Sequence, residues 1–539
     1  MINRTPWSSE RYVRAGLIGL LVAFTVVASF VRQPAITTGE DDAEYVLLSR
    51  SLREGHYRDV ADVSRAFHTR YPPAYPAALA VVAMVAGERV GVMTLVGIGW
   101  AIMTIVLLFA IARRYVGEST ALLACALLAL NPWFLTGAGR LMSEAQFTAL
   151  TVLTIWAGLG EPRTAGRDAL AGAAAILAAL TRLAGVPLVA ALLVDWLLRR
   201  RLRSAVALVV VSMLSIGSWL WFAAASPEQF LGTSYIADAA TIVDGPDPTS
   251  ARPVTEVTAP SLVAAIASRA YRNARGYVTT LLPYRLGVPT IRRAVVDNVA
   301  WSVAVITLLA IGLAGLWKHS RLLVLFMAAY GALLVVWTWR IDRFLDPVIP
   351  FILFGMVLGC TMLRRTRWPW LQYATLVPLA TLIGASNVQL NAATIRRAAD
   401  CDRRQPTVSP ACFGGVDRAF FAAAHYADST TSASAVFLTP KQRVFHYYSD
   451  RRIFPYRRAL ALSPPRMIDS LRATGAEHVL VAPLGPVQIP YRARLQAVCE
   501  RLAVERQFDS NTILFRILRD GEPGDTRACE LLKTVRATR

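Results

Sequence analysis

The sequence has few charged residues and almost no lysine. Only 17% of its 539 residues are charged, whereas 55% are hydrophobic and the mean hydropathy is +0.43. A soluble enzyme of this length would not have that balance, so a polytopic membrane protein is the starting expectation. The net charge of +21 comes almost entirely from arginine. These arginines cluster at the ends of apolar runs, where they orient helices and meet anionic lipid.

Several motifs of soluble enzymes and nucleic-acid-binding proteins are missing. The chain has no Gly-rich phosphate loop, no zinc-knuckle spacing and no interleaving of basic and aromatic residues, so we expect no nucleic-acid partner. Its C-terminal part has no nucleophile elbow and no HExxH motif. There is neither a repeat of fixed period nor an inverted duplication of the transporter kind.

Cysteine is also rare, and its six copies are unevenly placed. Cys125 and Cys360 lie within apolar runs, where small core residues are expected. The other four all follow the last apolar run, and an even number in one compartment suggests disulfides and an oxidising exterior. Pairing cannot be read from sequence alone, and our expectation is Cys401–Cys412 and Cys499–Cys529.

Apolar runs punctuated by arginine predict about eleven membrane spans of roughly 20 residues or slightly fewer. Paired arginines at the inner turns place the N-terminus in the cytoplasm and the C-terminus outside, in a multi-pass protein of the cell (inner) membrane. A transmembrane domain is therefore expected over residues 1–389, with outer loops at 32–91 and 226–297. The spans are expected at residues 15–31, 92–112, 119–135, 145–158, 169–180, 186–198, 205–225, 299–316, 322–337, 347–362 and 371–389.

Residues 390–539 differ in character from the rest of the chain. Strand-like runs at 435–438, 478–482 and 512–517 alternate with helix-like runs at 412–426, 466–474 and 491–505. Alternating elements predict a small extracytoplasmic α/β domain. The predicted fold class is thus a polytopic α-helical membrane protein that carries this domain, whose expected role is packing or acceptor binding.

The most acidic stretch opens the first outer loop. Glu40, Asp41, Asp42 and Glu44 put four carboxylates into five positions, and Tyr45 follows. Carboxylates this close repel one another, so at least one is expected to have a raised pKa or to share a cation. A general base needs such a carboxylate, and so does a divalent cation such as Mg²⁺ or Mn²⁺. The alternative is a solvated loop that leads into a helix.

A proline-rich stretch at residues 70–76 ends the same loop. Pro72 and Pro73 keep the backbone extended, and Pro76 opens a helix. Arg70 is thereby held near the membrane surface, where it suits a lipid phosphate. An ordinary entry from loop to helix is the alternative explanation.

Further ionisable residues lie at other outer ends of the predicted spans. Arg140 and Glu144 flank Ser143, which could equally cap the next helix. An arginine at the edge of a membrane usually has a partner or a function, and Arg343 could form a local ion pair with Asp346. The second long loop is rich in arginine and tyrosine between residues 269 and 293, including Arg272. Such residues bind phosphate and sugar, but tyrosine also favours the membrane interface regardless of function.

Taken in order, five segments resemble motifs of the GT-C superfamily of membrane glycosyltransferases. They are residues 41–45, 71–76, 112–117, 140–144 and 343–350. The first is similar to the family's Asp-Glu-x-x-Tyr on the first outer loop, and the second to its Pro-Pro-x-Tyr/His-Pro/Trp. The resembling branch contains the protein O-mannosyltransferases and the lipid A aminoarabinose transferase. Many relatives have lysine before Pro-Pro, where this chain has Tyr71.

The resemblance implies transfer of a sugar from a polyprenyl-phosphate donor, with inversion, to a glycan, lipid or protein acceptor outside the membrane. Asp41 would be the base that deprotonates the acceptor hydroxyl or a carboxylate that organises a metal, and Asp42 takes the family's second acidic position. The candidate residues for the donor phosphate are Arg70, Arg343 and Arg272. The candidates for substrate contact are Tyr45, Tyr75, Glu144 and Arg140.

Two functions from other classes compete with this one. A transporter or flippase for an amphipathic lipid-linked substrate predicts ionisable groups near mid-span, broken helices and internal symmetry. The ionisable groups of this chain gather at the outer ends instead. A non-catalytic scaffold that displays the C-terminal domain would leave the acidic stretch unexplained.

Overall fold

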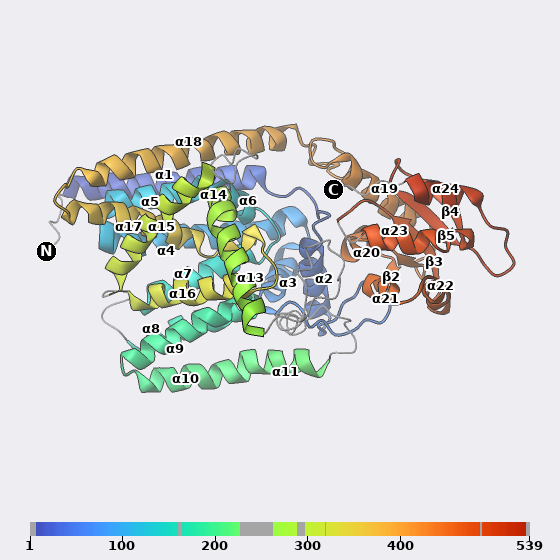
Figure 1. The fold of residues 1–539 in the computed structure, drawn as a ribbon, viewed down its shortest axis with the longest axis horizontal. Coiled ribbons are helices and arrows are strands. Elements are labelled where there is room, and N and C mark those ends of the chain that lie inside the picture. Colours follow the sequence, from blue (N-terminus) through green and yellow to red (C-terminus); the bar gives the residue numbers. More distant parts are fainter. Residues whose placement is uncertain are drawn as a thin grey trace.

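The computed structural model shows a helical bundle joined to a small α/β domain (Figure 1). It describes residues 7–159, 164–226, 262–287, 297–317, 320–485 and 488–534. The N-terminal end of α1 lies at the end of the bundle away from the α/β domain, and α2 lies at the end nearest to it (Figure 1). The first outer loop is therefore placed between the two parts of the molecule.

Long apolar runs form the bundle because a helix satisfies its own backbone groups where no water can do so. The predicted spans coincide with helices, except that residues 119–135 are divided between two helices and residues 205–225 contain a short π turn. The bundle helices are α1 (Trp7–Val31), α4 (Val90–Val116), α5 (Glu118–Ala129), α6 (Pro132–Ala138), α7 (Glu144–Gly158), α8 (Ala165–Thr181), α9 (Val186–Leu198), α10 (Leu202–Ser212), α11 (Ser218–Ala225), α15 (Asp297–Leu316), α16 (Arg321–Val336), α17 (Ile349–Met362) and α18 (Leu371–Asp400).

Shorter helices and turns connect or flank the bundle helices. The first outer loop contains α2 and α3, and the second contains α13, which runs across the bundle helices (Figure 1). Residues 227–261 and 288–296 of the second loop, with Arg292 and Arg293, lie outside the described residues. The elements are α2 (Asp41–Arg53), α3 (Ala74–Ala86), η1 (Leu183–Gly185), η2 (Met213–Gly217), α13 (Leu262–Gly276), η4 (Tyr277–Leu281), α14 (Leu282–Arg285), η5 (Asp342–Leu345) and η6 (Leu363–Arg365).

Hydropathy and length together identify a multi-pass membrane protein. Within the described residues, four helices are long and apolar enough to cross a membrane, and the bent pair α5 and α6 would make a fifth. The other predicted spans are shorter or more polar helices, so the number of about eleven stays a prediction. The four are Arg11–Val31, Val90–Val116, Leu202–Ala225 and Val299–Leu316.

One predicted span is wrong as a continuous helix. Residues 119–135 are divided between α5 and α6, which meet at a bend of 68°. Pro132 disfavours helical backbone at Asn131, which is extended (φ −63°, ψ 120°). The Asn131 side chain then accepts hydrogen bonds from the backbone N–H groups of Trp133 and Phe134, at 3.1 and 3.0 Å. The Asn-Pro pair thus ends one helix and caps the next.

The C-terminal part is an α/β domain, as predicted. Its sheet has the order β2-β1-β3-β5-β4, with β1 parallel to β2 and β3, and β5 antiparallel to β3 and β4. Both predicted disulfides, Cys401–Cys412 and Cys499–Cys529, are present. The elements are α19 (Gly415–Thr430), β1 (Val436–Leu438), α20 (Gln442–Ser449), β2 (Arg452–Ile453), α21 (Tyr456–Ala461), α22 (Pro464–Ala473), β3 (Ala476–Val481), α23 (Gln488–Gln496), η7 (Cys499–Arg501), β4 (Leu502–Gln507), β5 (Ile513–Ile517) and α24 (Thr526–Thr534).

Two boundaries of this region differ from prediction. The helix expected over residues 491–505 ends at Gln496, and Leu502–Gln507 forms strand β4 because it pairs with β5. The helix α18 continues to Asp400, past the boundary expected at residue 389, so the last bundle helix itself leads into the C-terminal domain.

Candidate active site

The site forms where α2 and the turn η5 meet, at the end of the bundle nearest the α/β domain (Figure 1). Asp41 is the first residue of α2, and Arg343 lies in η5, 302 residues later. Arg343 donates from Nη1 to Asp41 Oδ2 at 2.5 Å, and the Tyr71 hydroxyl donates to Asp41 Oδ1 at 2.9 Å. Both oxygens of this carboxylate are therefore oriented by donors from separate parts of the chain.

Asp41 is kept ionised by these partners. Burial by itself would raise the pKa of Asp41, but the charge and hydrogen bond of Arg343 and the hydrogen bond from Tyr71 more than offset it and lower the pKa. The same ion pair raises the pKa of Arg343. The side chain of Asp41 remains 20% exposed. It is thus a carboxylate that is both charged and reachable.

A second carboxylate adjoins this pair. Glu144, the first residue of α7, lies 2.8 Å from Arg182 Nη1 and 3.8 Å from Arg343 Nε, measured to its Oε1. Ser143 does not cap α7 with its side chain. Its Oγ instead lies 2.9 Å from Arg182 Nη1 and 2.8 Å from the Tyr45 hydroxyl. Two guanidinium groups and two carboxylates therefore form one chain of contacts across the end of the bundle.

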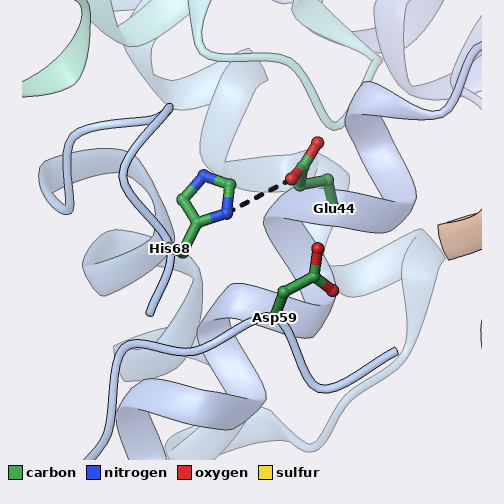
Figure 2. A group of neighbouring side chains, drawn as sticks. All are labelled: Glu44, Asp59 and His68. Atoms are coloured by element: carbon green, nitrogen blue, oxygen red, sulfur yellow. Dashed lines mark ion pairs between the residues drawn. The ribbon is translucent and has the colours of Figure 1, made fainter. Parts of the chain in front are cut away.

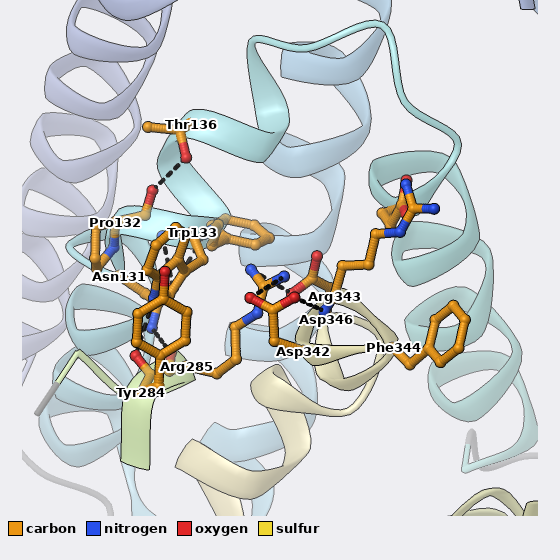
Figure 3. Close-up of polar contacts among 12 residues, drawn as sticks. Asn131, Pro132, Trp133, Thr136, Tyr284, Arg285, Asp342, Arg343, Phe344 and Asp346 are labelled. Atoms are coloured by element: carbon orange, nitrogen blue, oxygen red, sulfur yellow. Dashed lines mark hydrogen bonds and ion pairs between the residues drawn. The ribbon is translucent and has the colours of Figure 1, made fainter. Parts of the chain in front are cut away.

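Asp346 is paired with a distant arginine and not with Arg343. Arg285 Nη1 lies 3.1 Å from Asp346 Oδ1, and Arg285 Nη2 lies 3.4 Å from Asp342 Oδ2 (Figure 3). The alternative of a local Arg343–Asp346 ion pair is wrong, because η5 turns Arg343 toward α2. Burial, opposed by Arg285, raises the pKa of Asp346 to about 7.

A small, partly open cavity lies on the bundle side of these residues. It lies between α4, α6, α7 and the start of α17 and has a volume of about 20 Å³. Its lining is apolar except for a few polar groups, among them Glu144, Asp346 and Asn131. A space of this size has room for about one water molecule.

Asp42 occupies a different environment from its neighbour. Its side chain accepts hydrogen bonds from Gln33 Nε2 at 2.5 Å, from the Thr37 N–H at 2.8 Å and from the Ala43 N–H at 2.9 Å. Asp42 is only 3% exposed. Burial raises the pKa of Asp42, although these donors oppose it. The residue organises the loop before α2.

The other predicted site residues lie at varying distances from Asp41. Tyr45 and Tyr75 are buried, with ring centroids 4.8 Å apart. The Arg70 guanidinium lies 5.6 Å from the Tyr71 ring centroid and 5.5 Å from that of Trp339. Arg140 is exposed at the end of α6. Arg272 is exposed on α13 and donates to Ser268 Oγ at 2.5 Å.

Sequence reasoning missed the part that Tyr71 plays at the site. In the sequence, Tyr71 stands out only because it replaces the lysine of many relatives, yet its hydroxyl contacts Asp41. The position next to Pro72-Pro73 was the available signal. Arg182 lies inside an apolar stretch of the sequence, and no local pattern indicates that Glu144 is its partner.

The oxygen atoms of this site do not fit a divalent cation. Asp41 and Glu144 are each held by a guanidinium, which fills the place that a metal ion would take. A second group, Glu44, Asp59 and His68, offers ligand atoms that all lie within 4.8 Å of one another (Figure 2). This second group needs a separate test.

The tautomer of His68 argues against a metal in that second group. Burial lowers the pKa of His68 to about 3, so the ring is neutral. Its Nε2 accepts the Tyr71 N–H at 2.9 Å, and the ring proton is therefore on Nδ1, which faces Glu44 Oε1 at 3.4 Å. A protonated nitrogen has no lone pair to offer a metal ion. No step of the chemistry is therefore assigned to a metal.

Comparisons with known proteins agree with this architecture. Residues 70–227 match the model of the dolichyl-phosphate-mannose-protein mannosyltransferase family. No curated protein sequence matches the chain. The solved structure of ArnT from Cupriavidus metallidurans bound to undecaprenyl phosphate is 14% identical, with a TM-score of 0.57, and the match covers 94% of this chain and 98% of that one.

An archaeal enzyme shows the same fold. The Archaeoglobus fulgidus oligosaccharyltransferase in complex with Zn and sulfate is 12% identical, with a TM-score of 0.52 over 86% of this chain and 67% of that one. AglB from the same organism, in complex with an inhibitory peptide and a dolichol-phosphate, is 11% identical, with a TM-score of 0.52 over 88% and 70% of the two chains.

The chain therefore has the fold of the GT-C membrane glycosyltransferases, as its motifs predicted. Within that class, the match to ArnT extends over nearly the whole of both chains, so it includes the C-terminal domain as well as the bundle.

Proposed function

We propose that this protein transfers a sugar from a polyprenyl-phosphate donor to an acceptor hydroxyl at the outer face of the cell membrane. The observation that carries the proposal is the Asp41 carboxylate held by Arg343 at one end of a GT-C bundle, with Arg182 reached through Glu144. The fold supports the donor class, since similar structures contain undecaprenyl phosphate or dolichol-phosphate.

The chemistry needs one base and a cationic site for the leaving group. Asp41 takes the proton of the acceptor hydroxyl while that oxygen attacks the anomeric carbon of the donor from the face opposite the phosphate. The bond from the anomeric carbon to the phosphate oxygen breaks, and polyprenyl phosphate leaves with the electron pair. Arg343 and Arg182 stabilise the charge on the phosphate. Attack from the opposite face inverts the anomeric centre.

Asp41 suits the role of base better than Asp42. Asp42 is buried and its oxygens are occupied by loop donors, so an acceptor hydroxyl would have to displace structural hydrogen bonds to reach it. Asp41 is exposed enough to be reached and charged enough to accept a proton. The transporter alternative gains no support, because the site's ionisable groups lie at the outer end and not at mid-span.

The test is a deletion strain complemented with variants, in which surface glycans and lipid-linked sugars are measured by mass spectrometry. Loss of the gene should remove one sugar modification and let its lipid-linked donor accumulate. Asp41→Asn should reduce the modification at least about a hundredfold, since general-base catalysis contributes 10²- to 10⁴-fold. The protein level in the membrane should stay unchanged.

Asp42→Asn is the matched comparison. It should keep measurable transfer but lower the apparent Tm, because a buried acceptor of several bonds is weakened. A fully active Asp41→Asn protein with an inactive Asp42→Asn protein would move the base by one residue. Full activity in both variants would remove the catalytic assignment.

A further inference from the structure

The C-terminal domain is joined to the first outer loop by backbone pairing. Val63 donates its N–H to the carbonyl of Ile453 in β2 at 3.1 Å, and Ile453 donates to the carbonyl of Ala61 at 2.9 Å. Residues 61–63 thus extend the edge of the domain's sheet. The domain and the loop that carries Asp41 therefore share hydrogen bonds as well as an apolar core.

One side chain of the domain reaches into the acidic group of the loop. Arg443, on α20, places Nη2 2.7 Å from Asp59 Oδ2 and 3.3 Å from Glu44 Oε1, with Nη1 3.7 Å from Glu40 Oε1. The Arg443 side chain is 15% exposed, and those of Glu44 and Asp59 are 7% exposed. A cation from one domain is thus surrounded by carboxylates of the other.

Because this contact is buried, its loss would be costly. Asp59 is the charged partner, because Arg443 more than offsets the effect of burial and lowers the pKa of Asp59, whereas burial raises the pKa of Glu44 to about 8. Removal of Arg443 would therefore leave the buried Asp59 carboxylate uncompensated. His68 is neutral and supplies no charge. Arg443 makes ion pairs with both Asp59 and Glu44, and Arg70 also faces Glu44 electrostatically.

Glu44 connects this group to the reacting carboxylate. Asp41 and Glu44 lie three residues apart on α2, so they share one helical turn. A helix moves as a rigid element over such a distance. A displacement of Glu44 would therefore shift Asp41 relative to Arg343, and misplacement by about 1 Å can cost about a hundredfold in rate.

We propose that Arg443 is a positioning residue for the transfer reaction: through Glu44 and Asp59, the C-terminal domain holds α2 so that Asp41 stays against Arg343. This inference rests on the function proposed above for Asp41. It assigns to the C-terminal domain a part in the chemistry, although none of its described residues touches the Asp41 carboxylate.

The experiment compares Arg443→Met and Arg443→Lys with Arg472→Met in the full-length protein in lipid nanodiscs. Arg472 is a matched control, because it pairs with Asp520 inside the same domain, away from the loop. The measurements are hydrogen exchange of the α2 amides, the Kd for undecaprenyl phosphate, and the rate with the polyprenyl-phosphate sugar identified in the deletion strain.

Arg443→Met should speed α2 exchange and lower kcat, each at least about tenfold, because local opening follows the loss of the contacts that hold an element. The Kd for undecaprenyl phosphate should change less than about threefold, since the phosphate contacts remain. Arg443→Lys should recover part of both losses, and Arg472→Met should match the wild type. Wild-type α2 exchange and kcat in Arg443→Met would overturn the proposal.

A double variant separates a positioning role of Arg443 from simple charge balance. It also keeps the proposal testable if Arg443→Met alone does not fold. Arg443→Met with Asp59→Asn removes one cation and one carboxylate together, so the apparent Tm should recover while kcat stays low. Full recovery of kcat would overturn the positioning role. If Asp41→Asn were itself fully active, the proposed function would fail instead, whatever the Arg443 variants show.

Discussion

At the scale of single residues, the environment of Asp41 sets the pH range in which it can act as a base. Its pKa is lowered, so activity should be present above that pKa and lost as pH falls through it. Tyr71→Phe removes the 2.9 Å hydrogen bond to the charged carboxylate. The pKa should then rise, and the acidic limb of the pH–rate profile should move to higher pH by up to about one unit.

Tyr45→Phe provides the control for that experiment. Tyr45 is also a tyrosine beside the site, but its hydroxyl bonds to Ser143 and not to Asp41. The acidic limb of the pH–rate profile of Tyr45→Phe should therefore stay in place even if the rate falls. Equal shifts in Tyr45→Phe and Tyr71→Phe would show that the Tyr71 hydroxyl does not control the ionisation of Asp41.

The sequence shows which charged residues lie at the ends of the apolar runs, but not how they pair. Asp346 follows Arg343 by three residues, and this short separation favours an ion pair between the two. The structure instead joins Arg343 to Asp41 and Asp346 to Arg285. A side chain's direction depends on the turn that carries it, and the 3₁₀ turn η5 could not be read from composition.

At the scale of elements, the bend between α5 and α6 depends on Asn131. Its side chain accepts two backbone N–H groups of α6 and donates to the Arg285 carbonyl at 2.6 Å. Asn131→Ala should lower the free energy of unfolding by about 1–2 kcal/mol, which is the upper part of the range for a lost N-cap. The measurement is the apparent Tm in detergent, at one fixed heating rate because unfolding of such proteins is often irreversible.

Asn131→Asp distinguishes the two contributions. Aspartate keeps the cap but cannot donate to the Arg285 carbonyl, so its apparent Tm should fall between those of Asn131→Ala and the wild type. An Asn131→Ala protein as stable as the wild type would mean that Pro132 alone fixes the bend.

Element prediction succeeded where a local pattern decides the structure. Apolar runs between arginines became helices because the membrane leaves the backbone no other partner. It failed over residues 502–507, where pairing with β5 overrides local preference. It also failed at Asn131-Pro132, because the surrounding apolar run favours one continuous helix although an Asn-Pro pair is a turn signal.

At the scale of the whole molecule, the docking of the C-terminal domain was beyond sequence reasoning. The domain was predicted as an α/β unit with a packing role, and both disulfides were confirmed. Arg443 and Asp59 are 384 residues apart, and no local pattern connects them. The sequence showed crowded carboxylates that need a cation, but it could not show that a distant arginine supplies it.

Docking should depend on pH through Glu44. Burial raises its pKa from 4.5 to about 8, and Asp59 adds to this whereas Arg443 opposes it. A raised carboxyl pKa means that the folded state holds the proton more tightly, so this contribution to stability is full below 4.5 and is lost as pH rises toward about 8. The pKa of Asp59 is lowered, so its contribution changes only in acid.

Glu44→Gln keeps the size of the side chain and removes its ionisation, so the pH dependence should flatten. His68 would titrate in the unfolded chain near its ordinary value of 6.5, but both proteins contain it, so the difference between them from about 6.5 to about 8 reports Glu44. Across it, the wild type should lose apparent Tm relative to Glu44→Gln, and its α2 and α20 amides should exchange faster relative to that variant. Parallel curves for the two proteins would show that Glu44 stays charged in the docked state.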